Sequence, residues 1–478
     1  MHKLTKHPPI LVNPEQQRRR KAKKVEHVNQ PLRCFKAYDV RGRVPEELNE
    51  DIAYRIGCAY AVHICPVEVV VGFDVRLTSQ EICAALSRGL TDMGANVINI
   101  GQCGTEEIYF ATSHLNAGGG IMVTASHNPA NYNGMKFVRE QSKPISGETG
   151  LSEICNLAER NNFTMAEKPG AISFAETHPD YVKKLLSYLD LSELPSLKIV
   201  TNAGNGGAGL TVDALEHSLP FEFVKLSHYP DGNFPNGVPN PLLTENREVT
   251  INAVLKAKAD IGIAWDGDFD RCFFFDENGR FIEGYYIVGL LAEAFLESEG
   301  GGRIVHDPRL TWNTQKVALK MGGEAIQSKT GHSYIKEKMR EESAVYGGEM
   351  SAHHYFRDFF YCDSGMIPWL LVVALMAKKG KPLSALVDQA IEAFPASGEI
   401  NCNVADPEQL KNELMAIYAD EAESVDLTDG LSIEFKEWRF NVRASNTEAV
   451  VRLNLETRAN LALLQEKTEA LLKHIRRG

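Results

Sequence analysis

The stretch Trp265-Asp266-Gly267-Asp268-Phe269-Asp270-Arg271 places three carboxylates at alternate positions and follows them with a guanidinium group. The apolar run at 259–264 before it is typical of a buried strand, and Glu277-Asn278-Gly279 after it is typical of a hairpin turn. Alternate side chains of an extended chain share a face, so we expect the three acids to converge at the end of a strand.

Convergence of these acids has a chemical consequence. Three anions this close repel one another, and burial raises their pKa values. A divalent cation relieves the repulsion, and a site built from a few carboxylate oxygens suits Mg²⁺ better than zinc. The motif therefore predicts a metal site formed by Asp266, Asp268 and Asp270. The alternative interpretation is a solvated acidic turn.

Strand and helix patterns alternate in three successive parts of the chain. The first set predicts a strand at 67–73, a helix at 79–93, a strand at 96–100, a helix at 106–114 and a strand at 121–125. Thr78 and Glu81 form a candidate capping box at the start of the first helix, and Gly94 ends that helix. Further sets begin near 197 and 303, so we expect three similar α/β domains with mixed sheets and no detectable sequence repeat.

The last part of the chain has a different pattern, with strands at 431–435 and 450–455 and a closing helix after Asn460. We interpret it as a smaller α+β domain, and we expect the four domains to surround a central cleft. Pro/Gly-rich or polar stretches near 177, 280 and 395 mark the expected boundaries. The predicted organisation is a disordered basic tail at 1–30, followed by domains at 31–177, 178–280, 281–395 and 396–478.

Composition narrows the class of protein. The net charge is −12, and residues 1–30 carry eight Lys or Arg against two Glu, so the remaining chain is more acidic still and should repel nucleic acid. The nine cysteines are odd in number and scattered, which favours a reducing cytoplasm over a disulfide framework or a zinc site. No apolar run approaches the ~20 residues that cross a bilayer, so we expect no membrane association. The sequence carries no signal for the oligomeric state.

A second motif, Thr124-Ala125-Ser126-His127-Asn128-Pro129, follows an apolar strand and presents Ser126 as a candidate nucleophile. It lacks the Gly-x-Ser-x-Gly elbow, and in an extended chain His127 would point away from Ser126, so a hydrolase triad explains it poorly. A serine can instead carry a phosphoryl group, because positioning and metal-assisted charge neutralisation lower that barrier. The alternative interpretation is an ordinary turn.

Three further segments carry polar groups suited to a sugar phosphate. Residues 443–448, Arg-Ala-Ser-Asn-Thr-Glu, offer the donors that a phosphate dianion requires, although they also suit a simple turn. Residues 329–332 and 347–354 offer donors and acceptors for sugar hydroxyls. The adjacent His353 and His354 are poor candidates for binding one metal ion, and either could have a purely structural role.

Together these residues resemble the α-D-phosphohexomutase family, within it the bacterial phosphomannomutase and phosphoglucomutase branch. The resemblance covers roughly residues 33–478, and its motifs appear in the family's order: Ala37–Gly42, Thr124–Pro129, Asp266–Arg271, Gly348–His353 and Arg443–Glu448. It implies domains that in chain order carry a phosphoserine, a metal, the sugar-binding residues and a clamp for the distal phosphate.

The resemblance also implies roles for individual residues. Ser126 would be the phosphoserine and would complete a Mg²⁺ site with Asp266, Asp268 and Asp270, while Arg271 would neutralise the transferred group. The other implied contacts with the reacting phosphoryl group or the substrate are those of Tyr38, Arg41, His127, Lys136, Arg309, Lys329, His332, Glu349, Ser351, Arg443, Ser445, Asn446 and Thr447. Lys136 and His353 are both candidates for proton transfer, and the choice between them stays open.

Three positions depart from the family pattern. Arg309 stands where many members have lysine, Ala352 replaces a glycine, and Ala449 replaces a proline. None of these changes removes a reacting group. The first two lie on the substrate side, so they bear on which sugar is accepted.

The predicted activity is a reversible mutase reaction between mannose 6-phosphate and mannose 1-phosphate, through a phosphoserine and a hexose 1,6-bisphosphate, that supplies GDP-mannose synthesis. Glucose phosphates are an alternative substrate, because the two sugars differ only at C2 and share the hydroxyls that Glu349 and Ser351 would contact. Three competing hypotheses are a Mg²⁺-dependent sugar phosphatase, a non-catalytic sugar-phosphate sensor, and a nucleic-acid adaptor that binds through its basic tail.

Overall fold

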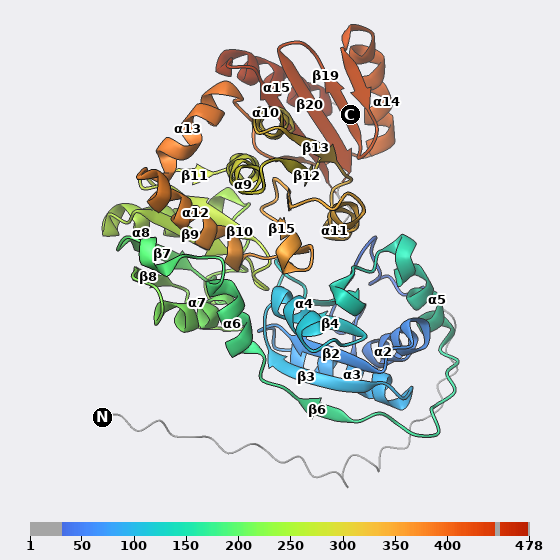
Figure 1. The fold of residues 1–478 in the computed structure, drawn as a ribbon. Coiled ribbons are helices and arrows are strands. Elements are labelled where there is room, and N and C mark those ends of the chain that lie inside the picture. Colours follow the sequence, from blue (N-terminus) through green and yellow to red (C-terminus); the bar gives the residue numbers. More distant parts are fainter. Residues whose placement is uncertain (1–30, 445–449, 477–478) are drawn as a thin grey trace. The chain divides into compact units, whose positions relative to one another are not determined.

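The computed structural model of this chain describes residues 31–444 and 450–476. In these residues the chain forms four β-sheets with helices packed against them (Figure 1), and residues from Leu32 onward belong to one compact unit. The expected α/β fold, with three similar mixed-sheet domains and a distinct C-terminal domain, is confirmed. No helix in the described parts of the chain combines the length and apolar composition of a bilayer-crossing segment.

The first three sheets share one arrangement of four strands. The first sheet has the order β1 (Val40–Arg43), β5 (Tyr132–Arg139), β4 (Gly119–Val123), β2 (Glu68–Phe73), β3 (Asn96–Gln102) and β6 (Ile172–Phe174). The second has the order β11 (Phe281–Ile282), β10 (Cys272–Phe275), β9 (Ile261–Trp265), β7 (Lys198–Asn202) and β8 (Glu222–Leu226). The third has the order β16 (Cys362–Asp363), β15 (His354–Phe356), β14 (Tyr346–Gly348), β12 (Gly302–His306) and β13 (Gly323–Gln327).

In each of these sheets three parallel strands are followed by an antiparallel one. Strands β4, β9 and β14 are the last parallel strands, and each pairs with the antiparallel strand that comes next in the chain. The three connecting loops, 124–131, 266–271 and 349–353, therefore occupy equivalent positions. They contain three of the motifs found in the sequence.

The fourth sheet is wholly antiparallel, with the order β17 (Ile400–Cys402), β21 (Val451–Thr457), β20 (Trp438–Ala444), β19 (Leu431–Glu434) and β18 (Ser424–Asp426). The α-helices are α2 (Glu50–Ile64), α3 (Ser79–Asp92), α4 (Thr105–His114), α5 (Ser152–Arg160), α6 (His178–Leu186), α7 (Ala208–Glu216), α8 (Glu248–Ala257), α9 (Gly284–Glu299), α10 (Trp312–Lys320), α11 (His332–Glu341), α12 (Met366–Lys379), α13 (Leu383–Ala393), α14 (Pro407–Tyr418) and α15 (Leu461–Ile475). Short helical turns are η1 (Glu140–Ser142), η2 (Gly147–Leu151), η3 (Leu191–Glu193), η4 (Thr244–Asn246), η5 (Arg357–Phe359) and η6 (Ala419–Glu421).

One local prediction was wrong. Helix α3 begins after Thr78 as expected, but the Thr78 side chain does not cap it. Its hydroxyl instead accepts a hydrogen bond from Asn133 Nδ2 at 2.9 Å, which ties the helix start to β5. Thr78 thus bonds to a residue that is distant in the sequence instead of capping its own helix.

Buried carboxylates join the sheets at helix N-termini. The Glu106 carboxylate on α4 accepts a hydrogen bond from the Gly365 amide at 2.6 Å, at the start of α12. Glu456 on β21 accepts one from the Thr311 amide at 2.7 Å, at the start of α10. Helix N-termini attract anions, so these contacts dock the first sheet and the fourth sheet onto the third.

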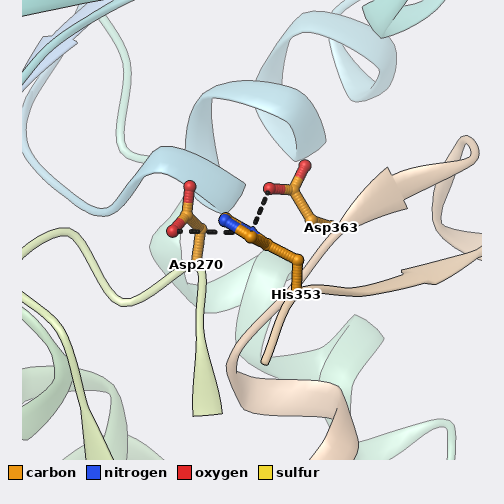
Figure 2. Close-up of side chains that lie close together, drawn as sticks. All are labelled: Asp270, His353 and Asp363. Atoms are coloured by element: carbon orange, nitrogen blue, oxygen red, sulfur yellow. Dashed lines mark ion pairs between the residues drawn. The ribbon is translucent and has the colours of Figure 1, made fainter. Parts of the chain in front are cut away.

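Loops from different sheets consequently meet. Figure 2 shows Asp270, from the loop after β9, beside His353 and Asp363 of the third sheet. The His353 imidazole lies between the two carboxylates, with Nδ1 3.2 Å from Asp363 and 3.9 Å from Asp270.

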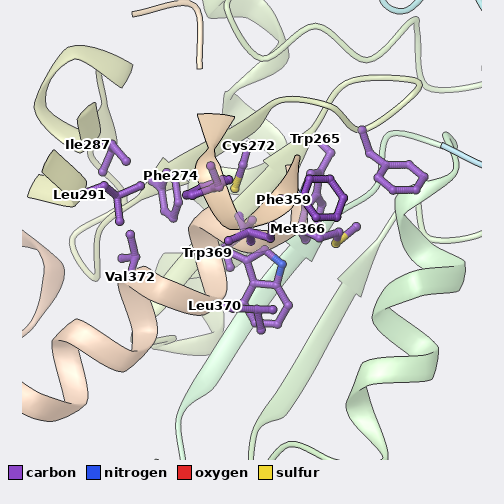
Figure 3. Close-up of a cluster of buried hydrophobic side chains, with 14 of the residues drawn as sticks. Trp265, Cys272, Phe274, Ile287, Leu291, Phe359, Met366, Trp369, Leu370 and Val372 are labelled. Carbon is purple, nitrogen blue, oxygen red and sulfur yellow. The ribbon is translucent and has the colours of Figure 1, made fainter. Parts of the chain in front are cut away.

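The hydrophobic core is continuous between the second and third sheets. Figure 3 shows Trp265, Cys272 and Phe274 of β9 and β10 packed with side chains of α9 and α12. The Trp265 and Trp369 rings meet edge to face at 6.4 Å, and Trp265 Nε1 donates a hydrogen bond to the Gly365 carbonyl at 2.8 Å. The strand that leads into residues 266–271 is thereby fixed against α12.

We predict that Trp369→Ala lowers the free energy of unfolding by roughly 3–5 kcal/mol, because it leaves a cavity beneath β9. Urea denaturation followed by circular dichroism measures this loss. Leu319→Ala on α10 is the control: Leu319 is 81% exposed, so its loss should change stability by at most about 0.5 kcal/mol. Equal stability of the two variants would contradict the packing role of Trp369.

Candidate active site

A central cavity of about 70 Å³ is lined by residues of all four sheets and their loops, which confirms the expected cleft. The predicted residues that line it are Tyr38, Arg41, Ser126, His127, Lys136, Arg271, Arg309, His332, Glu349, Ser351, His353 and Arg443. Lys329 is exposed and lies outside this lining. The predicted Ser445, Asn446 and Thr447, with Ala449 and the basic tail at 1–30, lie outside the described residues.

Ser126 lies at the tip of the loop after β4. Its hydroxyl donates a hydrogen bond to Asp266 Oδ2 at 2.7 Å, so the nucleophile candidate and the acidic loop meet directly. His127 also lies close, with Nδ1 3.0 Å from the Ser126 hydroxyl, contrary to the expectation that it points away. The reason is the backbone: Ser126 has φ +50°, a left-handed conformation, and the chain there is not extended.

Arg76 holds this loop in place. Its guanidinium donates hydrogen bonds to four backbone carbonyls, those of Ser126 at 2.8 Å, Asn128 at 2.6 Å, Pro129 at 2.8 Å and Tyr132 at 2.9 Å. Arg76 is almost fully buried, so these bonds form away from water. Sequence reasoning missed this residue, because its carbonyl partners have no side-chain signature.

A signal for Arg76 was nevertheless present. Residues 74–78 and 307–311 share the pattern Asp-x-Arg-Leu-Thr, and they follow the equivalent strands β2 and β12. In both segments the Arg amide donates to the Asp carboxylate, at 3.0 Å for Arg76 and 2.9 Å for Arg309. The expectation that the units share no sequence repeat was therefore wrong for this short segment.

Arg309 is fully buried beside the cavity. Its guanidinium forms hydrogen bonds with Asp307 at 2.9 Å, Glu399 at 2.9 Å and the Ser351 hydroxyl at 3.2 Å. Burial alone would lower the pKa of Arg309, but the two carboxylates raise it above its ordinary value. Arg309 thus links the loop at 349–353 to the segment that leads into β17.

The loop at 349–353 contains a strained residue. Ala352 has φ +71°, in the left-handed region that favours glycine. The glycine that the family resemblance implies at this position would adopt such a conformation without strain. Glu349 in the same loop accepts hydrogen bonds from the Gly331 amide at 3.0 Å and the Tyr355 hydroxyl at 2.5 Å, which fix its carboxylate.

The three acids converge as predicted, although for a different reason. Residues 266–271 form a loop between β9 and β10, and Phe269 has φ +46°, so the acids do not alternate along an extended strand. The Phe269 ring is seated against Gly104 and Gly207, where an added Cβ would lie 2.2 Å and 2.8 Å from ring atoms. One oxygen from each of the three carboxylates lies within 4.8 Å of the others.

The acidic cluster is fully buried and partly compensated. Lys136 Nζ donates hydrogen bonds to Asp268 at 2.7 Å and Asp270 at 2.5 Å, and the Thr105 hydroxyl donates to Asp268 at 2.6 Å. Burial alone would raise the pKa of Asp268, but the Lys136 ammonium outweighs it and lowers this pKa. Burial and the Asp268 charge raise the pKa of Asp270 to about 7.

These residues fit a divalent cation. Asp268 Oδ1 and Asp270 Oδ1 are buried and have no hydrogen-bond partner among the described residues. One oxygen of each carboxylate can therefore bind another ligand. The donor set is all oxygen, which hard cations prefer. Arg271 lies at the same place: its Nη2 donates to Asp266 at 2.7 Å and contacts His127 Nδ1.

Two histidines in the cavity have different electrostatic surroundings. Burial and the Arg271 guanidinium lower the pKa of His127 well below its ordinary value, so its imidazole is neutral near pH 7. Burial also lowers the pKa of His332, whose ring packs edge to face with Tyr38 at 4.9 Å. Neither ring nitrogen of His332 has a hydrogen-bond partner in the described parts of the chain.

Guanidinium groups dominate the rest of the lining. Arg41 is oriented by Asp39 at 2.8 Å and by Asn128 at 2.7 Å, and Arg443 forms an ion pair with Asp429 at 3.4 Å. With Arg271, Arg309 and Arg452, these residues surround the cavity with positive charge. Such a lining suits a small substrate that carries phosphate groups.

Comparison with known families matches nearly the whole chain. The description "Phosphoglucomutase/phosphomannomutase, alpha/beta/alpha domain I" matches residues 32–165. Domain II of the same family matches residues 179–279, domain III matches 283–394, and the C-terminal domain matches 399–473. These ranges follow the four sheets in order.

Individual proteins are similar over the same length. A phosphomannomutase of Salmonella montevideo is 57% identical over 449 residues, which cover 92% of this chain and 98% of that protein. The phosphohexose mutases of Xanthomonas campestris pv. campestris (strain B100) are 57% identical over 445 residues, covering 93% and 99%. A crystal structure of a phosphoglucomutase/phosphomannomutase family protein from Burkholderia thailandensis has a TM-score of 0.83 at 32% identity, covering 93% and 98%.

We predict that Arg76→Met loosens the loop at 124–131. Loss of hydrogen bonds from a buried charged donor should lower the local opening free energy by roughly 2–3 kcal/mol, which amide hydrogen exchange of this loop measures. Arg88→Met is the control, because Arg88 is half-exposed and its ion pair with Glu50 is 3.6 Å long. Unchanged exchange of the loop in Arg76→Met would contradict this role.

Proposed function

The chain belongs to the phosphoglucomutase/phosphomannomutase family, and we propose that it is a phosphomannomutase that interconverts mannose 6-phosphate and mannose 1-phosphate. The observation that carries this proposal is the 2.7 Å hydrogen bond from the Ser126 hydroxyl to Asp266, which joins a candidate nucleophile in the lining of an arginine-rich cavity to the buried acidic cluster. The 57% identity to a phosphomannomutase over most of both chains supports the choice of sugar.

In this proposal Asp266, Asp268 and Asp270, together with a phosphorylated Ser126, hold Mg²⁺. The ion supplies charge neutralisation for the transferred phosphoryl group. Arg271, within 3.4 Å of the Ser126 hydroxyl, adds positive charge to the same place. Lys136 bridges Asp268 and Asp270 and keeps the two carboxylates in position.

The reaction consists of two phosphoryl transfers. In the first, the bond between Ser126 Oγ and phosphorus breaks and leaves Oγ as an alkoxide, while a bond forms between phosphorus and a sugar hydroxyl oxygen. The hydroxyl proton passes to His353, or to Lys136 if its amine is neutral at that moment. The product is a hexose 1,6-bisphosphate. After it turns around in the cavity, its other phosphoryl group returns to Ser126, and the sugar oxygen recovers a proton.

Other residues would hold the substrate. We propose that Tyr38, Arg41 and His127 surround the reacting phosphoryl group, and that Lys329, His332, Glu349 and Ser351 contact the sugar. Arg443, Ser445, Asn446 and Thr447 would grip the non-reacting phosphate, and Arg309 would contact the substrate. Lys329 is not among the lining residues, so it would have to turn inward to take part.

The cavity must also exclude water, because hydrolysis of the phosphoserine would end the cycle. This requirement separates the mutase from the phosphatase alternative, which shares the metal and the nucleophile.

We further propose that the enzyme works in the cytoplasm and supplies GDP-mannose synthesis. The proposed domain boundaries lie near 177, 280 and 395.

Phosphorylation of Ser126 gives a direct test. Ser126→Ala should lose sustained conversion of mannose 1-phosphate, a drop of at least roughly 10³-fold, because no other hydroxyl carries the phosphoryl group. Intact-mass spectrometry should show one phosphate on wild type and none on this variant. Ser87→Ala on α3, whose hydroxyl donates to the Cys83 carbonyl, is the control and should keep both.

Two results would overturn the proposal. Release of inorganic phosphate in proportion to mannose 1-phosphate consumed, without mannose 6-phosphate, would identify a phosphatase. A clearly higher kcat/KM for glucose 1-phosphate than for mannose 1-phosphate would assign the enzyme to glucose phosphates.

The metal site makes a separate prediction. Asp268→Asn removes a buried ligand charge and should weaken Mg²⁺ binding about 100-fold or more, since even partners of metal ligands are worth 10- to 100-fold. Isothermal titration with MgCl₂ measures the affinity, and activity should then require more Mg²⁺. Asp388→Asn, a half-exposed partner of Arg280, is the control. Equal Mg²⁺ affinity in the two variants would rule out this set of ligands.

A further inference from the structure

A buried carboxylate that no motif identified stands behind His353. Asp363, on the edge strand β16, is fully buried, and its Oδ2 lies 3.2 Å from His353 Nδ1 (Figure 2). Asp363 does not line the central cavity, whereas His353 does. His353 therefore offers a direct route by which Asp363 can influence the reaction.

The other oxygen of Asp363 has its own partner. Lys336 Nζ, on α11, donates a hydrogen bond to Asp363 Oδ1 at 3.0 Å, and this lysine is also fully buried. The Lys336 ammonium lies 3.1 Å from the Tyr109 hydroxyl and 4.2 Å from the centre of the Tyr109 ring, on α4 of the first sheet. These contacts form one continuous series that begins at Tyr109, passes through Lys336 and Asp363, and ends at His353 in the cavity lining.

This arrangement fixes both ends of Asp363. A buried carboxylate without partners is costly, and Lys336 offsets that cost on one oxygen only. The second oxygen is left to accept a hydrogen bond from the imidazole. When Nδ1 carries the proton, it donates a hydrogen bond to the carboxylate, and this bond holds the ring in one orientation. The unprotonated Nε2 then carries the lone pair.

We propose that Asp363 is a positioning residue for phosphoryl transfer: anchored by Lys336, it holds the His353 ring with Nδ1–H toward itself and Nε2 toward the substrate hydroxyl. The proposal rests on the proposed function, because it assigns His353 as the group that takes the hydroxyl proton. It follows the general design in which a third group orients a catalytic base. It also favours His353 over Lys136, whose ammonium is already bonded to two carboxylates.

The same cluster has a second interpretation. Asp270, His353 and Asp363 offer three ligand atoms within 4.8 Å of one another, which is the spacing of a small metal site. However, the Lys336 ammonium already pairs with Asp363, and Asp270 belongs to the carboxylate set proposed for Mg²⁺. A second dication would be repelled by both of these cations, so we favour the positioning role.

The first test separates kcat from KM. Asp363→Asn keeps the shape of the side chain but removes its charge, so we expect kcat to fall about 10- to 100-fold, as for other groups that orient a catalytic ligand. KM for mannose 1-phosphate should stay nearly unchanged, because Asp363 does not touch the cavity. Each rate is divided by the fraction of enzyme that carries phosphorylated Ser126, measured by intact mass, so that unphosphorylated protein does not lower the kcat obtained. A rise in KM with unchanged kcat would overturn the proposal.

A double-mutant cycle tests whether Asp363 acts through His353. Once His353→Asn has removed the imidazole, adding Asp363→Asn should cause no further loss of kcat. If the two losses multiply, Asp363 acts elsewhere and the proposal is wrong. Lys336→Met combined with Asp363→Asn gives a matched comparison: removing both buried charges should recover thermal stability while kcat stays low. Recovery of kcat together with stability would reveal a purely structural ion pair.

A third measurement does not depend on activity. In ¹⁵N NMR of the histidine side chains, the His353 signal is the one that disappears in His353→Asn. In the wild type this signal should show a proton fixed on Nδ1. In Asp363→Asn it should show a proton that exchanges between the two ring nitrogens. An identical signal in both proteins would overturn the proposal even if the enzyme proved inactive on mannose phosphates. Titration with Mn²⁺ monitored by EPR distinguishes the alternative: loss of one of two bound ions in Asp363→Asn would identify a metal site instead.

Discussion

The structure depends on the burial of charge at one point, where the carboxylates of the loop after β9 meet cations and hydroxyls from the first sheet. Asp268 and Asp270 share the Lys136 ammonium, and Asp266 accepts the Ser126 hydroxyl. Buried charges are tolerated only when they are paired. The pairing therefore holds the first and second sheets together and at the same time places the Ser126 hydroxyl beside the three carboxylates.

Repetition of one topology explains how the functional loops come together. The loops at 124–131, 266–271 and 349–353 each follow the last parallel strand of a sheet, at the carboxyl end where ligands bind in α/β folds. The Asp-x-Arg-Leu-Thr segments extend the parallel: Arg76 holds the Ser126 loop through its carbonyls, and Arg309 contacts Ser351 in the third sheet. In both sheets the arginine is fixed by its own aspartate, so its position does not depend on a substrate.

The cavity combines rigid and adaptable parts. Lys136 and Arg271 are fixed by hydrogen bonds to the acidic cluster, whereas both nitrogens of the buried His332 lack partners among the described residues. A reaction in which the intermediate must bind in two orientations needs fixed groups around the transferred phosphoryl and more permissive contacts around the sugar. The chain supplies the first through buried ion pairs and the second through neutral side chains.

The sequence by itself determined the family, the α/β class, several elements in each domain and most of the cavity lining, because periodicity and short motifs are local properties of the chain. It did not determine geometry. It placed the acids on an extended strand and turned His127 away from Ser126, and both errors arose at residues with positive φ, Phe269 and Ser126, that a one-dimensional pattern does not reveal. It also passed over Arg76 and Asp363, whose partners are backbone carbonyls and side chains distant along the chain. Only the tertiary structure selected these partners, since a buried charge is satisfied by whichever groups the packing brings within a few ångströms.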